Sequence, residues 1–330
     1  MIVLDGGMGD ELRIRSPGVN WSPLSIQTHA DTIVECHCDY IKAGARVIET
    51  WNYSATPFWI RGQDGWADKT EAEVMALWEE LTRSSVRLAK ASIEKCKAPS
   101  VRIAGALPPL LSTYNTDDRL PEGDMLKLYT LLAKTLLDEG VDLLLVETCA
   151  CVEYAAVALE ACQTVSAEAE VWVSFTLQDK NPLLWSGESV EYAVATLCHG
   201  GDGSSAKSLA TPAAIMFNCS PPEVISAALA LLRPIFSGKI GAYGNRLGLR
   251  KSYGVDEARK QTEELEAMGI IDATAATGSP RAGGHWRKRE DLGPNEYLAW
   301  CVDWVMLGAD IVGGCCGIGP EYIEAVADSV

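Results

Sequence analysis

The sequence lacks the features that would assign it to a membrane, to a nucleic acid or to a secretory route. It has no stretch of about 18 consecutive apolar residues, so no membrane-spanning helix is expected. Basic residues are few, with 28 Lys and Arg against 45 Asp and Glu, and the formal net charge of −17 opposes binding to phosphate backbones and anionic lipids. The N-terminus shows no basic segment of the kind that opens a signal peptide. We therefore expect a cytoplasmic protein with small-molecule partners, and neither a nucleic-acid nor a membrane partner.

Several catalytic signatures are also absent from the sequence. No glycine-rich dinucleotide fingerprint follows a predicted strand, and there is no P-loop, nucleophile elbow or Ser-His-Asp order. The four histidines show no metal-ligand spacing with one another. The 11 cysteines, in a reducing compartment, are more readily explained as free thiols, ligands or nucleophiles than as a disulfide framework. The cysteines are therefore the remaining candidates for a metal-binding or reactive site.

Short apolar runs alternate along the chain with longer segments of helical period. Eight runs predict strands buried on both faces of a parallel sheet: 2–6, 46–50, 101–107, 141–147, 171–177, 213–218, 239–243 and 309–313. Eight segments predict helices: 31–44, 69–97, 123–139, 151–166, 189–199, 221–235, 294–307 and 319–329. This alternation favours an α/β fold, a (β/α)8 TIM barrel formed as a single domain by residues 1–330. A doubly wound open sheet is the alternative.

Three stretches interrupt the alternation. Residues 51–68 and 200–212 are expected to be loops, because the first follows a strand directly and the second is rich in small residues. Residues 244–293 form an insertion after the seventh strand, with one predicted helix near 255–268.

Three cysteines fall at the ends of two predicted strands. Cys219 follows the sixth strand, and Cys315 and Cys316 follow the eighth. Only one strand separates these two in a closed barrel, so three thiolates can converge on one tetrahedral Zn²⁺ and leave a fourth position for a substrate. An isolated Cys-Cys pair is also explained by two buried small hydrophobic residues or by a redox-active pair. Spacing alone leaves these alternatives open.

Several motifs together resemble the homocysteine S-methyltransferase family. They are DGGMGDEL at 5–12, ET at 147–148 with Glu153, SGES at 186–189, NCSPPE at 218–223 and GADIVGGCCGIGPE at 308–321. Within the first motif, Asp10 stands where Thr is common. The resemblance covers nearly the whole chain, and the fold of that family is a (β/α)8 barrel.

The resemblance implies a metal and substrate site at the strand ends. Cys219, Cys315 and Cys316 match the zinc ligands of the family, and Asp5 and Glu147 match carboxylates near the amino group of homocysteine. Paired carboxylates suit an ammonium, because charge-assisted hydrogen bonds fix its orientation. Considered alone, Asp5 is equally explained as a turn residue and Glu147 as a charge at a helix N-terminus.

The sequence departs from the family pattern after two strands. TWNY at 50–53 stands where the family usually has Thr-Asn-Thr-Tyr, and YGN at 243–245 replaces Tyr-Pro-Asn. We place Thr50, Tyr53 and Asn245 among the substrate-binding residues. The departures cluster where a methyl donor would approach, so they leave the identity of the donor open.

Aromatic residues are concentrated after the second strand. Trp51, Tyr53, Phe58, Trp59 and Trp66 lie on or near one rim loop. Aromatic faces attract cations, and sulfonium and quaternary ammonium methyl donors are cations. We therefore assign Trp51 and Trp59 to the donor side, with packing at the barrel rim as the alternative.

Taken together, the sequence and the resemblance predict a zinc-dependent methyltransferase. It would move a methyl group from a sulfonium donor, S-methylmethionine or S-adenosylmethionine, to the thiol of homocysteine and give methionine. The alternatives are betaine as donor, another thiol or selenol as acceptor, and a zinc- and thiol-binding protein without catalysis. A metal-free barrel with a redox-active Cys315–Cys316 pair is a further alternative. The expected assembly is a monomer or a simple homo-oligomer.

Overall fold

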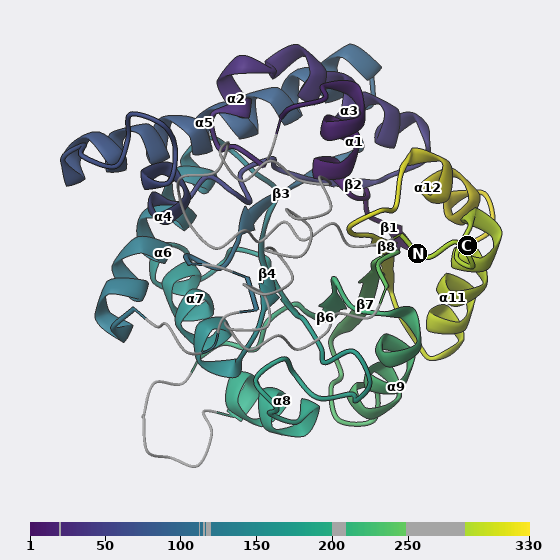
Figure 1. The fold of residues 1–330 in the computed structure, drawn as a ribbon. Coiled ribbons are helices and arrows are strands. Elements are labelled where there is room, and N and C mark those ends of the chain that lie inside the picture. The colour runs from purple at the N-terminus through teal and green to yellow at the C-terminus, as the bar shows by residue number, and fades with distance from the viewer. Residues whose placement is uncertain (20, 112, 115, 117–119, 200–208, 249–287) are drawn as a thin grey trace, which may run out of the picture.

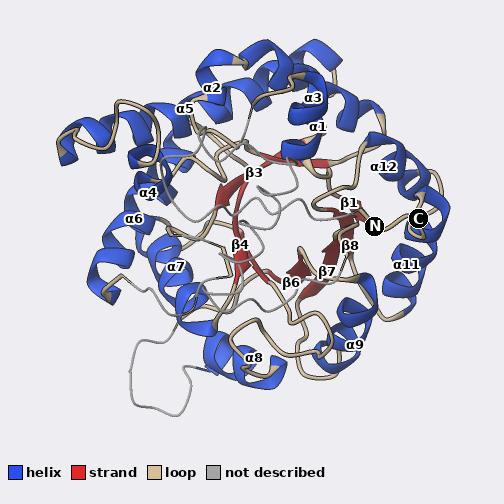
Figure 2. Cartoon of the chain, in the orientation of Figure 1, coloured by secondary structure: helices blue, strands red, loops and turns tan. Residues whose placement is uncertain are grey.

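The computed structural model describes residues 1–330 apart from 20, 112, 115, 117–119, 200–208 and 249–287. Eight parallel strands form one sheet in the order β1-β8-β7-β6-β5-β4-β3-β2. They are β1 (Ile2–Val3), β2 (Val47–Glu49), β3 (Arg102–Leu107), β4 (Leu143–Cys149), β5 (Val171–Phe175), β6 (Ala214–Asn218), β7 (Lys239–Gly244) and β8 (Ile311–Gly314). A parallel bridge between Leu4 and Val47 joins the two ends of this order and closes the ring. The predicted (β/α)8 barrel is confirmed, with the strands inside and the helices around them (Figure 1, Figure 2).

The helices in the described part of the chain include all eight that were predicted. They are α1 (Met8–Arg15), α2 (Ser25–Thr28), α3 (Ala30–Lys42), α4 (Pro57–Arg61), α5 (Glu71–Cys96), α6 (Glu122–Asp138), α7 (Val152–Val165), α8 (Val190–His199), α9 (Pro222–Leu232), α11 (Pro294–Met306) and α12 (Pro320–Ala327). Proline in the first turn of α9, α11 and α12 suits a helix start, because its missing N–H has no intrahelical acceptor there. No described helix has the length and apolar character needed to cross a membrane.

Three short helices were not predicted. The prediction that 51–68 is an uninterrupted loop is wrong, because α4 lies within it. Thr56 caps this helix by accepting a hydrogen bond from the backbone N–H of Trp59, and Pro57 occupies its first turn. With four and five residues, α2 and α4 are too short to show a helical period in the sequence, and α1 (MGDELRIR) has no continuous apolar face.

The insertion after β7 lies largely outside the described residues. The predicted helix near 255–268 belongs to that part, as does most of the predicted loop at 200–212. Leu247 and Lys288 form an antiparallel bridge, so the two ends of the insertion lie side by side. The chain therefore leaves the barrel and returns to it at one place beside the end of β7.

The hydrophobic core has two parts. One cluster fills the lumen of the barrel and takes residues from all eight strands: Leu4, Val47, Ala104, Leu143, Leu145, Trp172, Ala214, Met216, Tyr243 and Ile311. The larger cluster lies between the strands and the helices. Side chains alternate along a strand, so a residue two positions beyond a luminal residue also points into the lumen. Polar residues at the ends of the strands are thereby directed to the mouth of the barrel.

Candidate metal and substrate site

Three cysteine side chains converge where β6 and β8 end. The sulfur atoms of Cys219, Cys315 and Cys316 all lie within 4.8 Å of one another. Cys316 Sγ is 3.7 Å from Cys219 Sγ and 3.9 Å from Cys315 Sγ. These distances exceed the ~2.05 Å of a disulfide, so no disulfide joins Cys316 to either of the other two. The distances match the ~3.8 Å edge of a tetrahedron whose centre lies ~2.3 Å from each sulfur. The donor set therefore fits a zinc ion with one position left for a further ligand.

The backbone at Cys219 is held in a conformation that few residues adopt. Its φ is +49°, in the left-handed region that costs free energy for a residue with a side chain. The preceding Asn218 anchors the segment, since its Oδ1 accepts from Thr148 N at 3.1 Å and from Ser174 Oγ at 2.8 Å. Its Nδ2 also donates to Thr148 Oγ1 at 2.7 Å. This buried amide ties the ends of β4, β5 and β6 together and fixes the position of the thiol.

The turn that carries Cys315 and Cys316 packs against the segment that follows β1. A Cβ atom on Gly7 would lie 2.7 Å from the carbonyl oxygen of Cys315, so only glycine allows this approach. Asp10 on α1 accepts a hydrogen bond from Gly317 N through Oδ2 at 2.6 Å. Its other oxygen pairs with Arg13 at 2.5 Å. The conspicuous glycine-rich motif near the N-terminus therefore shapes the turn that carries the thiols.

The other side of the same turn is held by the residues that end β7. Cys315 N donates to Gly244 O at 2.9 Å, and Arg246 N donates to Cys316 O at 2.9 Å. Asn245 lies between them and is 2% exposed. Its Nδ2 donates to Cys219 Sγ at 4.0 Å. The structure thus brings Asn245 into contact with the thiol cluster.

Three carboxyl groups lie at the mouth of the barrel beside the thiols. Asp5 and Glu147 are 3% and 5% exposed, and Glu49 is half-buried. Burial raises the pKa of Asp5 and of Glu147 well above the usual range, and the nearby Glu49 raises both further. Burial likewise raises the pKa of Glu49 to about 7. In the part of the chain that the structure describes, no basic side chain lowers the pKa of any of the three. The group is therefore short of positive charge.

Glu49 was not among the predicted site residues. The signal that could have found it is strand parity, because Glu49 stands two positions beyond the luminal Val47. Its backbone N–H donates to Asp5 Oδ2 at 3.0 Å, which places the two residues side by side. The sequence motifs contain Asp5 and Glu147, whereas Glu49 belongs to none of them.

Thr50 makes its contacts within the framework of the barrel. Its hydroxyl donates to Asn52 Oδ1 at 2.6 Å and accepts from Ala106 N at 2.9 Å. These bonds connect the ends of β2 and β3. A direct role of Thr50 toward a substrate stays a prediction.

Tyr53 lies closer to the acids and the thiols. Its hydroxyl is 2.7 Å from Thr113 Oγ1. Burial raises the pKa of this phenol well above 10, and the neighbouring Glu147 and Cys219 raise it further. Tyr53 therefore lies near both Glu147 and Cys219, and its role toward a substrate stays a prediction.

The two tryptophans assigned to the donor side make different contacts. Trp51 is 6% exposed, donates from Nε1 to Ser25 Oγ at 3.1 Å and lies 5.5 Å from the ring of Trp21. Trp59 on α4 is half-buried and packs edge-on against Phe58 at 5.9 Å. The contacts of Trp51 are those of rim packing, and a role of either residue toward a donor stays a prediction.

Tyr114 and Trp185 lie at the thiols although nothing in the sequence singled them out. Tyr114 donates its hydroxyl to Cys219 Sγ at 3.0 Å. Trp185 donates from Nε1 to the carbonyl of Tyr114 at 2.7 Å, and the two rings are 5.1 Å apart. They come from the segments after β3 and β5, where no local pattern marks them. Aromatic surface beside the thiols is thus supplied from outside the tryptophan-rich loop.

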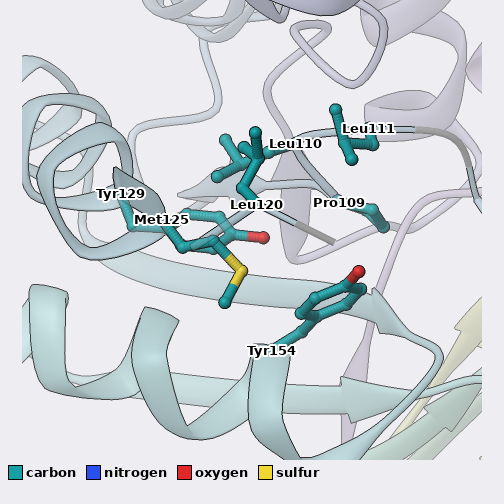
Figure 3. Close-up of a pocket in the computed structure, with 7 residues that line it drawn as sticks. All are labelled: Pro109, Leu110, Leu111, Leu120, Met125, Tyr129 and Tyr154. Carbon is teal, nitrogen blue, oxygen red and sulfur yellow. The ribbon is translucent and has the colours of Figure 1, made fainter. Parts of the chain in front are cut away.

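A small apolar hollow lies apart from this site, beyond the end of β3. Its lining consists of Pro109, Leu110, Leu111, Leu120, Met125, Tyr129 and Tyr154. The side chains of all seven residues surround it (Figure 3). The hydroxyl of Tyr129 is used by the backbone, since it donates to Pro108 O at 3.2 Å. None of the predicted site residues lines the hollow.

Comparison with known proteins assigns the chain to a family. The family model described as "Homocysteine S-methyltransferase" matches residues 2–330. Selenocysteine methyltransferase from Astragalus bisulcatus is 25% identical over 347 residues, which cover 98% of this chain and 90% of that protein. Homocysteine S-methyltransferase 1 from Zea mays is 26% identical over 354 residues, which cover 98% and 93%.

A solved structure shares the fold. The metallated form of the homocysteine methyltransferase MmuM from Escherichia coli matches with a TM-score of 0.72 at 24% identity, over 100% of this chain and 96% of that one. The resemblance of the motifs is confirmed by the match of the family model to almost the entire chain. The protein therefore belongs to the homocysteine S-methyltransferase family of methyltransferases.

Proposed function

We propose that this chain is a zinc-dependent enzyme that transfers a methyl group from a sulfonium donor, S-methylmethionine or S-adenosylmethionine, to the thiol of homocysteine. The observation that carries the proposal is the convergence of three thiols within 4.8 Å, beside a group of buried carboxyls. The first feature suits a soft divalent metal, and the second suits the ammonium group of an amino acid. Their proximity fits a substrate that carries both a thiol and an amine.

In this proposal Cys219, Cys315 and Cys316 hold the zinc ion. When bound, zinc supplies the charge that keeps a substrate thiol ionised and nucleophilic at neutral pH. Hydrogen bonding with Cys219 and burial raise the pKa of Cys315 and Cys316 well above 9, so a cation is needed to hold these groups as thiolates. The metallated form of the Escherichia coli neighbour supports the assignment of a metal site.

The remaining residues orient the amino thiol. Asp5 and Glu147 accept hydrogen bonds from its ammonium group, and Tyr53 lines the space between the acids and the thiols. Asn245 donates to Cys219 Sγ and so orients that thiolate. Thr50 holds the ends of β2 and β3 in place beneath them. These roles place the reacting sulfur near the metal and the amine near the acids, which is the positioning on which such a transfer depends.

The charge of the site favours a cationic donor. Once zinc and the substrate ammonium hold them ionised, three carboxylates and three thiolates lie together, and no basic side chain in their described surroundings offsets them. S-methylmethionine carries a sulfonium and an ammonium against one carboxylate, whereas betaine carries a single cation against its carboxylate. A net positive donor is therefore attracted more strongly than a neutral one. Trp51 and Trp59 remain our proposal for the aromatic side of the donor.

A selenol acceptor is the second candidate for the same site. The similarity to selenocysteine methyltransferase from Astragalus bisulcatus favours it. Selenocysteine also carries an ammonium, so the acids suit it as they suit homocysteine. A protein that binds zinc and the thiol without turnover is the alternative of another class.

The test is zinc content together with methyl transfer. We expect about one zinc per chain after purification under reducing conditions, and formation of methionine from homocysteine and S-methylmethionine. Cys316→Ala should lose both zinc and activity. Cys198→Ala on α8, a partly buried cysteine away from the site, should keep both. Zinc-loaded wild-type protein that methylates neither homocysteine nor selenocysteine with any sulfonium donor or with betaine would leave the non-catalytic alternative.

A further inference from the structure

Glu49 faces the same space as the two acids assigned to the substrate, and the proposed site does not use it. Val47, two positions earlier on β2, belongs to the cluster that fills the lumen, so Glu49 also points into the lumen. The same parity places Glu147 beyond the luminal Leu145 on β4. Asp5 is joined to Glu49 by the hydrogen bond from Glu49 N to Asp5 Oδ2 at 3.0 Å. Glu49 from β2, Glu147 from β4 and Asp5 from the segment after β1 therefore lie close together at the mouth of the barrel.

An unsatisfied hydroxyl lies at the same place. Tyr243 on β7 is 1% exposed and belongs to the luminal cluster. Its hydroxyl makes no well-formed hydrogen bond among the described residues, although Ser174, whose own hydroxyl donates to Asn218, lies close enough to lower the pKa of the phenol. Burial raises the pKa of Tyr243, and the nearby Glu49 and Glu147 raise it further, so the phenol lies in the neighbourhood of both acids. A buried polar atom without a partner is rare and points to a group that completes the site.

The number of acids matches the chemistry of a primary ammonium. Such a group has three N–H donors and no acceptor, as in the lysine side chain. Two carboxylates leave one N–H without a charged acceptor, and a third carboxylate supplies it. No basic side chain in the described surroundings of the three acids competes for them.

We propose that Glu49 is a third acceptor for the ammonium group of the amino-acid substrate, so that Asp5, Glu49 and Glu147 together make the site specific for thiols that carry a primary amine. This inference rests on the proposed function, because it takes the acceptor to be an amino thiol. The Tyr243 hydroxyl donates to one of these carboxylates when the ammonium is in place. Glu49 is then a specificity-determining residue that touches the substrate.

A purely structural role for Glu49 predicts a different outcome for the ligand-free protein. Buried carboxyl groups that lack a positive partner oppose folding, because each loses solvation and repels its neighbours. Replacing Glu49 with glutamine therefore should raise the thermal midpoint of the ligand-free protein while it weakens substrate binding. A structural acid would show a lower thermal midpoint on the same replacement.

The experiment compares two thiols that differ only in the amine. Homocysteine and 4-mercaptobutanoate are titrated calorimetrically into zinc-loaded wild-type protein, Glu49→Gln, Glu49→Asp and Glu191→Gln. Glu191 lies exposed on α8 and serves as the control for the loss of one charge. Glu49→Gln should weaken homocysteine roughly 10- to 100-fold, the range of a hydrogen bond to a charged group, and leave 4-mercaptobutanoate unchanged. Glu49→Asp should recover part of the loss, and Glu191→Gln should change neither affinity.

Equal weakening of both thiols by Glu49→Gln, or no weakening of homocysteine, would overturn the inference. A second pair of ligands separates it from the proposed function. Methionine and 4-(methylthio)butanoate need no metal-activated thiol, and Glu49→Gln should weaken only methionine. If homocysteine is not methylated but methionine binding still depends on Glu49, the proposed function fails and the ammonium pocket stands. If Glu49→Gln leaves methionine binding unchanged, the proposed ammonium pocket is wrong, whether or not the protein methylates homocysteine.

Discussion

His37 on α3 is a buried histidine without a hydrogen-bond partner among the described residues. Its protonation should have a measurable effect on the free energy of unfolding. The side chain is 0% exposed, and neither ring nitrogen has a hydrogen-bond partner in the described structure. Burial lowers its pKa from 6.5 to about 3. Between these values the unfolded chain binds a proton that the folded chain does not, so the free energy of unfolding falls as the pH falls below 6.5.

His37→Leu should remove this part of the acid sensitivity. We expect the variant to lose less free energy of unfolding than the wild type between about pH 7, above the unfolded pKa, and about pH 5, between the two pKa values. Urea denaturation at both pH values measures the difference. His29→Gln, at a partly exposed histidine, is the control and should follow the wild type. Identical pH dependence of His37→Leu and the wild type would show that the imidazole finds a partner in solution.

Glu49 gives a pH dependence of the opposite sign. Its pKa is raised from 4.5 to about 7, so the folded chain binds more protons than the unfolded chain between these values. The stability that it contributes is present below its unfolded pKa and is lost as the pH rises through about 7. Ligand-free Glu49→Gln should therefore lose less free energy of unfolding than the wild type between about pH 5 and pH 8. Denaturant unfolding of both proteins measures this, and a larger loss in the variant would contradict it.

At the scale of elements, α1 holds the turn that presents two of the thiols. Asp10 accepts from Gly317 N at 2.6 Å, directly after Cys316, and pairs with Arg13 on its own helix. Residues that orient metal ligands affect metal affinity by about 10- to 100-fold when removed. Asp10→Ala should therefore weaken zinc binding by that order, and Asp10→Asn, which keeps an acceptor oxygen, should weaken it less. Competition with a chromophoric chelator measures the affinity.

The matched control for that experiment is Asp31→Ala, at an exposed acid in the first turn of α3. Asp31→Ala removes the same charge, but the Asp31 side chain does not contact the turn that carries Cys315 and Cys316. Unchanged zinc affinity in Asp10→Ala would show that the glycine-rich packing around Gly7 holds the turn without the carboxylate. Equal losses in both variants would assign the effect to net charge alone.

The eight strands and eight major helices were predictable because their signals are local. A strand buried on both faces, such as β4, is apolar along its length, and the long helices show a clear period. The short α4 was not predictable from its period, and only Thr56 before Pro57 indicated its start. Elements were therefore predicted where an apolar run or a helical period marks them locally, and missed where neither is present.

The site was predictable where adjacent residues carry it, and unpredictable where the fold brings distant residues together. Cys315 and Cys316 are marked by their motif, and the ring of strands supplies Cys219 as the third sulfur. Tyr114 reaches Cys219 across 105 positions of sequence, which no local pattern records. Glu49 is visible in the sequence at the end of a strand. Its proximity to Asp5 becomes apparent only in the fold.

At the scale of the whole molecule, charge links the surface to the site. The chain carries a net charge of −17, and its thiols and carboxyls are gathered at one end of the barrel. A net positive donor is therefore attracted to the molecule over a distance set by the electrostatic screening length. This length falls as ionic strength rises. A neutral zwitterion such as betaine experiences little of this attraction.

The kcat/KM for S-methylmethionine should consequently fall as sodium chloride is raised from about 50 mM to about 300 mM, because the screening length shortens over that range. The rate with betaine, if it is measurable, should change much less. Initial rates of methionine formation at subsaturating donor and saturating homocysteine give this comparison. Potassium glutamate in place of sodium chloride controls for a specific effect of chloride. An equal response of both donors to salt would mean that the field of the protein does not select the donor, and that the choice is made by contacts inside the barrel mouth alone.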